Sequence, residues 1–163
     1  MRREGRGMSR VGRVLAWVAL TPILTLVAGI VGCEARKAYY DWQVREMCEK
    51  DGGVTVVESV VLTRDEYAGL LNRFGQLDIP SRKKASTGTA LLHVDKYEYY
   101  RENNPRVTRD ELSVLRVADN KVLGTRVSYS RVGGDFLAFH PSIFSCPSVN
   151  ADLFALVVQQ SKE

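Results

Sequence analysis

Residues with catalytic or metal-binding chemistry are scarce in this sequence of 163 residues. It holds two histidines, His93 and His140, and three cysteines. It contains no Gly-x-Ser-x-Gly elbow, phosphate-binding loop, dinucleotide fingerprint, two-histidine metal helix or Cys-x-x-Cys pair. The usual signatures of serine hydrolases, nucleotide-binding enzymes and thiol oxidoreductases are therefore missing. We predict no catalytic residue, no cofactor and no metal site, and we expect a protein that is not an enzyme.

A basic surface is also lacking once the N-terminal segment is set aside. The whole chain carries a formal net charge of +4. Of its 23 basic and 19 acidic residues, five arginines and one glutamate precede Cys33, which leaves 18 of each sign from Glu34 onward. Because nucleic-acid binding depends on a basic surface, this balance argues against a nucleic-acid partner. The exported part, about 130 residues, is enough for one domain with a modest core.

The longest stretch without a charge, Val14 to Gly32, dominates the N-terminal part. As a helix its nineteen residues can cross a hydrocarbon layer about 30 Å thick. Five arginines precede it: Arg2, Arg3, Arg6, Arg10 and Arg13. Because such basic flanks stay in the cytoplasm, the chain is expected to have its N-terminus inside and its later residues in the periplasm of a bacterial cell. We divide it into a basic segment (1–13), a membrane anchor (14–33) and an exported domain (34–163).

Two interpretations of the anchor remain open. Ile30-Val31-Gly32-Cys33 fits a bacterial lipoprotein signal, in which the segment before Cys33 is removed and lipid on this cysteine holds the protein to a membrane. The favoured interpretation is an uncleaved single-pass helix in the inner membrane. The apolar run is longer than a signal peptide usually requires, and Tyr39, Tyr40 and Trp42 follow where an interfacial aromatic belt is expected.

The other two cysteines, Cys48 and Cys146, lie deep in the exported part. An oxidising compartment is expected to join them as a disulfide that closes a loop of about 100 residues. The alternative is a pair of buried free thiols. Zinc is a weaker interpretation because neither cysteine has a ligand partner at zinc-finger spacing.

The exported part alternates helix and strand signals, and so predicts an α+β domain whose antiparallel sheet of about four strands packs with two or three helices. Helices are expected over 34–50, after a capping box that begins at Thr63, and over 151–160. Strands are expected over 54–62, 89–101, 107–118 and 122–131, the last three as a meander. An exposed loop is expected over 79–87 and an irregular segment over 133–147. In the first helix, one face is expected to carry Ala35, Ala38, Tyr39, Trp42 and Met47.

Two clusters of glycine and aspartate lie near the inner cysteines. Asp51-Gly52-Gly53 follows Cys48, and Gly133-Gly134-Asp135 precedes His140 and Cys146. If the cysteines are joined, Asp51 and Asp135 can come near each other, and a cation or a polar ligand could sit between them. The favoured interpretation is that the glycines permit positive φ in tight turns beside the disulfide and that the aspartates cap these turns.

The same two segments carry a resemblance. Cys-Glu-Lys-Asp-Gly-Gly-Val (48–54), together with Gly-Gly-Asp (133–135) and His-Pro-Ser-x-Phe-Ser-Cys-Pro (140–147), resembles a group of uncharacterised bacterial and prophage envelope proteins. The resemblance covers both ends of the exported domain and not the middle, 65–120. It implies an envelope location and a domain with paired cysteines, and it implies no activity.

These observations favour a non-enzymatic envelope module that binds another envelope protein or a surface component. Tyr97 and Tyr99 share one face of an expected strand and are a candidate patch, although cross-strand packing explains them better. One alternative is an anchored hydrolase or metal-dependent enzyme centred on Asp135, His140 and Ser142. A further alternative is a phage-encoded membrane protein that prevents competing phage from entering.

Overall fold

The computed structural model describes residues 10–86, 88–136, 140–146 and 152–161, with side chains from Trp17 onward. Its elements are α1 (Arg10–Asp51), β1 (Gly53–Val56), β2 (Val60–Leu62), α2 (Arg64–Gly69), β3 (Leu91–Arg101), β4 (Arg106–Arg116), β5 (Lys121–Val132), β6 (Ile143–Cys146), α3 (Leu153–Val157) and β7 (Val158–Gln160). The fold is α+β, which confirms the predicted class.

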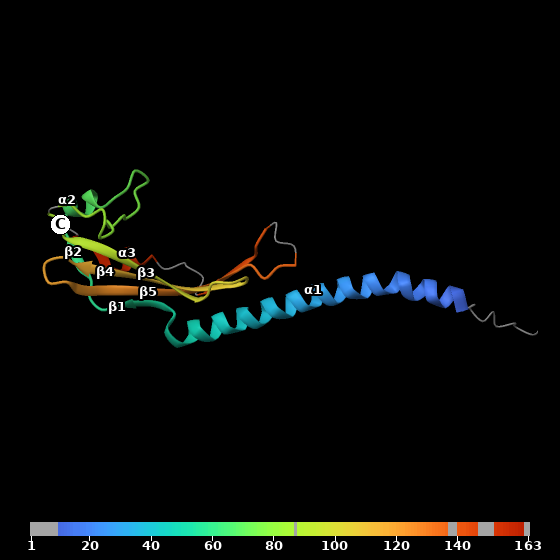
Figure 1. Cartoon of the computed structure of the whole chain (residues 1–163). Coiled ribbons are helices and arrows are strands. Elements are labelled where there is room, and N and C mark those ends of the chain that lie inside the picture. The colour runs from blue at the N-terminus through green and yellow to red at the C-terminus, as the bar shows by residue number, and fades with distance from the viewer. Residues whose placement is uncertain (1–9, 87, 137–139, 147–151, 162–163) are drawn as a thin grey trace, which may run out of the picture.

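Helix α1 continues from the apolar anchor into the domain without a break. Its N-terminal half projects away from the sheet (Figure 1), and none of its most apolar window is buried. By length and composition it is able to cross a membrane. The helix expected over 34–50 is therefore the second half of one 42-residue helix that also contains the anchor.

Proline at position 22 lies inside α1, where it removes the N–H that would bond to the carbonyl of Val18. The Thr21 hydroxyl donates to that carbonyl at 3.3 Å and to the carbonyl of Trp17 at 2.9 Å. Hydroxyls commonly satisfy backbone acceptors in this way in helices that lack water around them. This local pattern is compatible with a membrane environment for the anchor.

The main sheet has the strand order β1-β5-β4-β3, and β6 also pairs with β5. The meander β3–β4–β5 is antiparallel as predicted. β1 pairs with residues 124–127 of β5 and β6 with residues 129–132, so these two short strands lie end to end along one edge of β5. A separate parallel pair joins β2 to β7.

Three expected elements differ from those observed. The strand predicted over 54–62 is divided into β1 and β2, because the chain turns where the Val57 and Glu58 amides both donate to the Leu123 carbonyl. The segment 133–147, expected to be irregular, contains β6, and the last helix ends after five residues and continues as β7. The capping box is confirmed: the Thr63 hydroxyl accepts from the Glu66 amide, and the Glu66 carboxylate accepts from the Thr63 amide.

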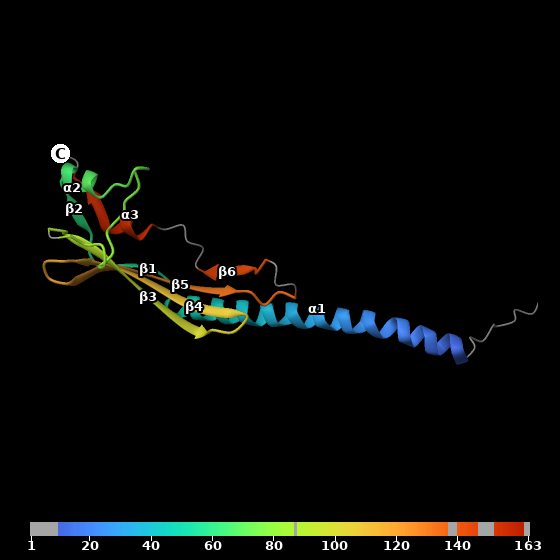
Figure 2. The same ribbon diagram turned by 45° about the horizontal axis from the view of Figure 1, so that its top comes forward.

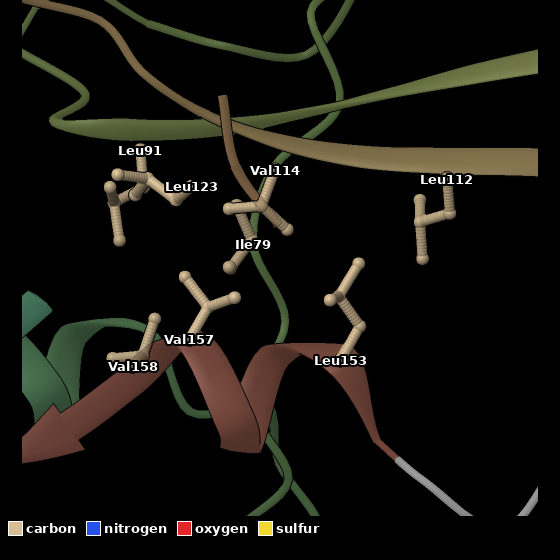
Figure 3. Close-up of a cluster of buried hydrophobic side chains, with 8 residues drawn as sticks. All are labelled: Ile79, Leu91, Leu112, Val114, Leu123, Leu153, Val157 and Val158. Carbon is tan, nitrogen blue, oxygen red and sulfur yellow. The ribbon is translucent and has the colours of Figure 1, made fainter. Parts of the chain in front are cut away.

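Two apolar clusters hold the sheet between α1 and α3. Figure 3 shows the first, in which Leu153 and Val157 of α3 pack against Leu112 and Val114 of β4. Ile79 belongs to it and is fully buried, so the expectation of an exposed loop is wrong at its first residue. The second cluster packs the α1 side chain of Val44 against the opposite face of the sheet, through Val107, Val127 and Tyr129.

The buried face of α1 is not the one expected. Ala35, Ala38, Tyr39 and Trp42 are exposed, and only Met47 of the expected set faces the sheet. The stripe against the sheet instead includes Lys37, Tyr40, Asp41, Val44 and Cys48. Two of these side chains are charged, and they are accommodated because Arg131 of β5 pairs with Asp41 and Asp135, which follows β5, pairs with Lys37. A pattern based on apolar spacing alone cannot find such a stripe.

Candidate functional site

A concave surface rich in aromatic side chains lies between α1 and β3. It has a volume of about 640 Å³ and is lined mainly by Tyr39, Tyr40, Trp42, Met47, Tyr100 and Arg101. We name it the aromatic groove. The side chains of Tyr39, Trp42 and Tyr100 are each about half exposed. Because half-exposed rings around a concavity offer a partner a large apolar area with polar tips, this groove is the best candidate binding site of the domain.

A β-bulge builds the β3 wall of the aromatic groove. The register of β3 against β4 shifts between Tyr99 and Arg101, which makes Tyr100 an extra residue. The ring of Tyr100 lies 6.0 Å from that of Tyr129, and the Arg101 guanidinium lies 5.1 Å from the ring of Tyr40. Successive side chains of a regular strand point to opposite faces, and a bulge changes where one of them points. Both Tyr100 and Arg101 therefore reach the side of the sheet that α1 covers.

Four residues with charged or amide side chains line the aromatic groove: Gln43, Glu46, Lys50 and Arg101. Arg101 is set apart by one buried nitrogen. Its Nε atom is buried and has no hydrogen-bond partner among the residues that the structure describes. A buried donor without an acceptor costs about 1–3 kcal/mol. Because Arg101 lines the groove with a positive charge, it favours a ligand that brings an oxygen acceptor, such as a carbonyl or a carboxylate.

The predicted tyrosine patch lies elsewhere. Tyr97 and Tyr99 pack against each other with ring centroids 5.0 Å apart. In the sheet register Tyr99 is opposite Thr108, whose neighbour Val107 faces α1. Since neighbours alternate in direction, the pair lies on the face away from the aromatic groove. The sequence indicated an aromatic strand end, but the bulge that separates Tyr100 from this pair gives no signal in the sequence.

The cysteines are placed as expected. Cys48 and Cys146 form a disulfide with a Cα–Cα distance of 6.1 Å, and it ties the C-terminal part of α1 to the end of β6. Cys33 is a free thiol, half-buried on α1. Beside the disulfide, Gly52 lies so close to Cys48 that an added Cβ atom would be 2.6 Å from both the carbonyl oxygen and the sulfur of that residue. Any larger residue at this position has to displace the disulfide or the end of the helix.

Asp51 is engaged in a contact between α1 and the sheet. Its carboxylate accepts a hydrogen bond from the Tyr129 hydroxyl at 2.7 Å and lies 3.4 Å from Arg109 Nη2. Burial raises the pKa of Tyr129 above its ordinary value, and the bond to Asp51 raises it further. This hydroxyl therefore stays protonated and keeps donating to Asp51.

A buried cation organises the base of the β5–β6 loop (133–142). Arg131 is only 3% exposed, and its Nε lies 2.5 Å from a carboxylate oxygen of Asp41 on α1. Its Nη1 donates to the carbonyl of Gly133 and to the hydroxyl of Ser142, the latter at 3.0 Å. One side chain thus fixes both ends of the loop and joins them to the helix.

Asp135 joins the two ends of the same loop to each other and to α1. It accepts a hydrogen bond from the Ser142 amide at 2.6 Å and pairs with Lys37 of α1 at 3.2 Å. The bond from the Ser142 amide, helped by Lys37, lowers the pKa of Asp135 to about 2. The aspartate remains charged at any physiological pH.

The structure does not bring Asp51 and Asp135 together. Asp135 contacts α1 at Lys37, fourteen residues before Asp51, which is about 21 Å along a helix. His140 is exposed, and it hydrogen-bonds to neither Asp135 nor Ser142 in the part of the chain that the structure describes. The Ser142 hydroxyl lies against the cation of Arg131, where a nucleophile would need a base. Within the described ranges, no cluster of three or more histidine, cysteine or acidic residues is able to hold a metal ion.

The pH dependence of stability tests the contacts that Asp135 makes in the loop. Because its pKa is lower in the folded protein than in the unfolded chain, its stabilising effect is complete above about pH 5 and is lost as the pH falls through about 2. The difference in unfolding free energy between the parent and Asp135→Asn is therefore expected to shrink over that interval. Parallel denaturant titrations from pH 2 to pH 7 measure it.

The variant Lys37→Met separates the effect of Lys37 on the pKa of Asp135 from the effect of the Ser142 amide. It is expected to raise the pKa of Asp135 while leaving it below the ordinary 3.8, because the amide of Ser142 has the larger effect. Carboxyl-resolved NMR titration gives this pKa directly. A value near 4 for Asp135 in the parent protein would contradict the described loop.

Comparison with known protein families, with curated proteins and with solved structures finds no match to this chain.

Proposed function

We propose that this protein is a membrane-anchored, non-enzymatic binding module of the bacterial envelope, which holds a segment of another envelope protein in the aromatic groove. The observation that carries the proposal is the gathering of half-exposed aromatic rings around one concavity of about 640 Å³. Tyrosine, tryptophan and arginine are the residues most often responsible for affinity at protein interfaces. A peptide also supplies the carbonyl oxygens that suit Arg101.

Anchoring by an uncleaved helix, with the domain in the periplasm, is the second part of the proposal. The five arginines before Val14 favour a cytoplasmic N-terminus. Cys33 lies within a helix that continues to Asp51, so cleavage before it would divide a continuous element. The same orientation puts Cys48 and Cys146 in an oxidising compartment, where a disulfide persists.

The variant Cys33→Ser tests the mode of anchoring. A spanning helix does not need the thiol, so we expect the variant to remain in the membrane fraction and to differ in mass only by the substitution. Intact-mass spectrometry of both proteins measures this. Acyl chains on Cys33 in the parent, or release of the variant from the membrane, would establish lipid anchoring instead.

A photo-crosslinking amino acid in place of Trp42 tests the aromatic groove. In cells that express the full-length chain, we expect a discrete adduct that is sensitive to protease. Adding Tyr100→Ala is expected to reduce its yield about tenfold or more, since loss of a central interface aromatic commonly costs about 2 kcal/mol.

Phe74 is a matched control, because this residue is 71% exposed and lies outside the groove. The same photo-crosslinker at Phe74 should not give the adduct. Equal labelling from both positions would mean that the groove is not a specific site. An adduct that resists protease and is cleaved by a muramidase would identify a glycan and overturn the protein partner.

A further inference from the structure

Residues 133–136, which follow β5, contact α1 closer to the apolar run than β5 itself does: Asp135 pairs with Lys37, whereas Arg131 pairs with Asp41. The described ends of the β5–β6 loop lie beside the helix in both views (Figures 1 and 2). A Cβ atom added to Gly29 would lie 3.1 Å from Cε2 of Phe136, so the phenylalanine ring packs directly against the helix backbone at that glycine. Gly29 belongs to the uncharged segment Val14–Gly32. The domain therefore touches its own anchor three residues inside the end of the apolar run.

Phe136 is a large apolar residue that stays partly exposed beside the helix. The residue is 44% exposed although one edge of its ring rests on the helix. Three helical residues correspond to about 4.5 Å, so an anchor that spans the bilayer would place Gly29 just inside the hydrocarbon boundary. The exposed side of the ring then faces lipid. In water the same side would remain an exposed apolar surface.

Polar contacts hold the loop at this height. The Asn104 side chain, from the β3–β4 turn, accepts a hydrogen bond from the Gly134 amide at 2.6 Å. Arg36 of α1 donates to the Asn104 carbonyl at 2.8 Å, and Lys37 pairs with Asp135 beside it. These charged residues of α1 follow the apolar run directly, at the level where lipid headgroups are expected. The Phe136 ring thus lies at the level of the apolar run, and the charges of Arg36 and Lys37 lie on its headgroup side. This order matches the apolar and polar layers of a membrane surface.

We propose that Phe136 inserts into the outer-facing leaflet of the same membrane that holds α1, so that this residue is a second membrane contact of the domain. The proposal rests on the spanning orientation of α1 proposed above. A second contact beside the helix restricts the tilt of the domain, and it fixes the height at which the aromatic groove meets a partner. Lipid is the occupant of this surface because the ring is continuous with the lipid-facing surface of the anchor.

Tryptophan fluorescence in vesicles tests the proposal. The two native tryptophans, Trp17 and Trp42, are replaced by phenylalanine, and a single tryptophan is introduced as Phe136→Trp in the full-length chain. Vesicles of phosphatidylcholine brominated near the top of the acyl chains are the probe. We expect Phe136→Trp to lose most of its emission in these vesicles compared with unbrominated ones, with a blue-shifted maximum.

Two further single-tryptophan variants serve as controls for Phe136→Trp. Leu26→Trp, on the exposed apolar surface of α1, reports insertion of the anchor, and Phe74→Trp reports the part of the domain away from the loop. Quenching at position 26 without quenching at position 136 would overturn this inference while the anchor remains. Absence of quenching at both positions would overturn the spanning helix and the inference with it. Quenching at position 74 equal to that at position 136 would mean non-specific adsorption, and would also overturn it.

A second variant tests the contact with the helix. Gly29→Leu fills the space beside Phe136, so in the Phe136→Trp background it is expected to displace the ring and to change the depth at which bromine quenches it. Non-reducing peptide mapping of the disulfide shows that the variant is folded. An unchanged depth profile would show that the ring does not rest on Gly29.

Discussion

The replacement Asp41→Ala is expected to lower the free energy of unfolding by about 3–5 kcal/mol, because it leaves a buried guanidinium without its anion. Arg131 is 3% exposed, and Asp41 supplies its only carboxylate among the described contacts, at 2.5 Å. Water cannot easily reach the cation to replace that carboxylate. Denaturant unfolding of the detergent-solubilised full-length chain, followed by near-ultraviolet circular dichroism, measures the change.

A double-mutant cycle identifies the cause of this loss. The double variant Asp41→Leu with Arg131→Leu removes both charges together. Its loss of unfolding free energy is therefore expected to be smaller than the sum of the losses for Asp41→Leu and Arg131→Leu alone. Glu49→Ala serves as the control, because this glutamate is exposed on the same helix and its loss should stay within about 0.5 kcal/mol. A similarly small effect for Asp41→Ala would show that the helix is not held to the sheet by this pair.

Replacement of Cys48 by serine is expected to lower the free energy of unfolding by about 2–5 kcal/mol and to reduce the amount of folded protein in the membrane fraction. The disulfide joins residues 98 positions apart, and it fixes β6, which pairs with β5 through only four residues. Cys146→Ser should have the same effect. The double variant should be little worse than either, because each single replacement already removes the whole bond.

Gly52→Ala tests the same bond without removing a cysteine. An added Cβ atom would lie 2.6 Å from the Cys48 sulfur, so oxidation is expected to be incomplete. Mass spectrometry of a non-reducing digest counts linked peptides and alkylated thiols. Cys33→Ser should leave the linkage of Cys48 to Cys146 unchanged. If Cys48 and Cys146 are both alkylatable in the parent protein taken from the membrane fraction, the pairing is refuted.

The sequence by itself determined the features that depend on near neighbours and on composition. The uncharged run from Val14 to Gly32 indicated a membrane-spanning length, and the Thr63–Glu66 box defined the start of α2. The three-strand meander followed from short turns between β-rich segments, since such strands have no geometry other than antiparallel. The disulfide followed from an expected oxidising compartment and from the count, because only two cysteines lie well beyond the apolar run.

Only the tertiary structure decided which surfaces meet. The charged residues Lys37 and Asp41 lie on the buried stripe of α1 because oppositely charged partners approach them. These partners, Asp135 after β5 and Arg131 on β5, come almost a hundred residues later in the chain. A charged side chain is buried against a sheet only when an oppositely charged partner is present. Because helix periodicity carries no information about that partner, it assigns every charged residue to the solvent-facing side.

The aromatic groove has the same origin. The bulge at Tyr100 gives no signal in the sequence, and it is this bulge that separates the groove residues from Tyr97 and Tyr99. The alternative in which Asp51 and Asp135 come together is wrong for a related reason. The disulfide sets the distance between two cysteines, but the helix then carries the two aspartates to different levels of the domain. Local pattern thus determined the elements, and long-range pairing between charges, strands and cysteines determined the sites.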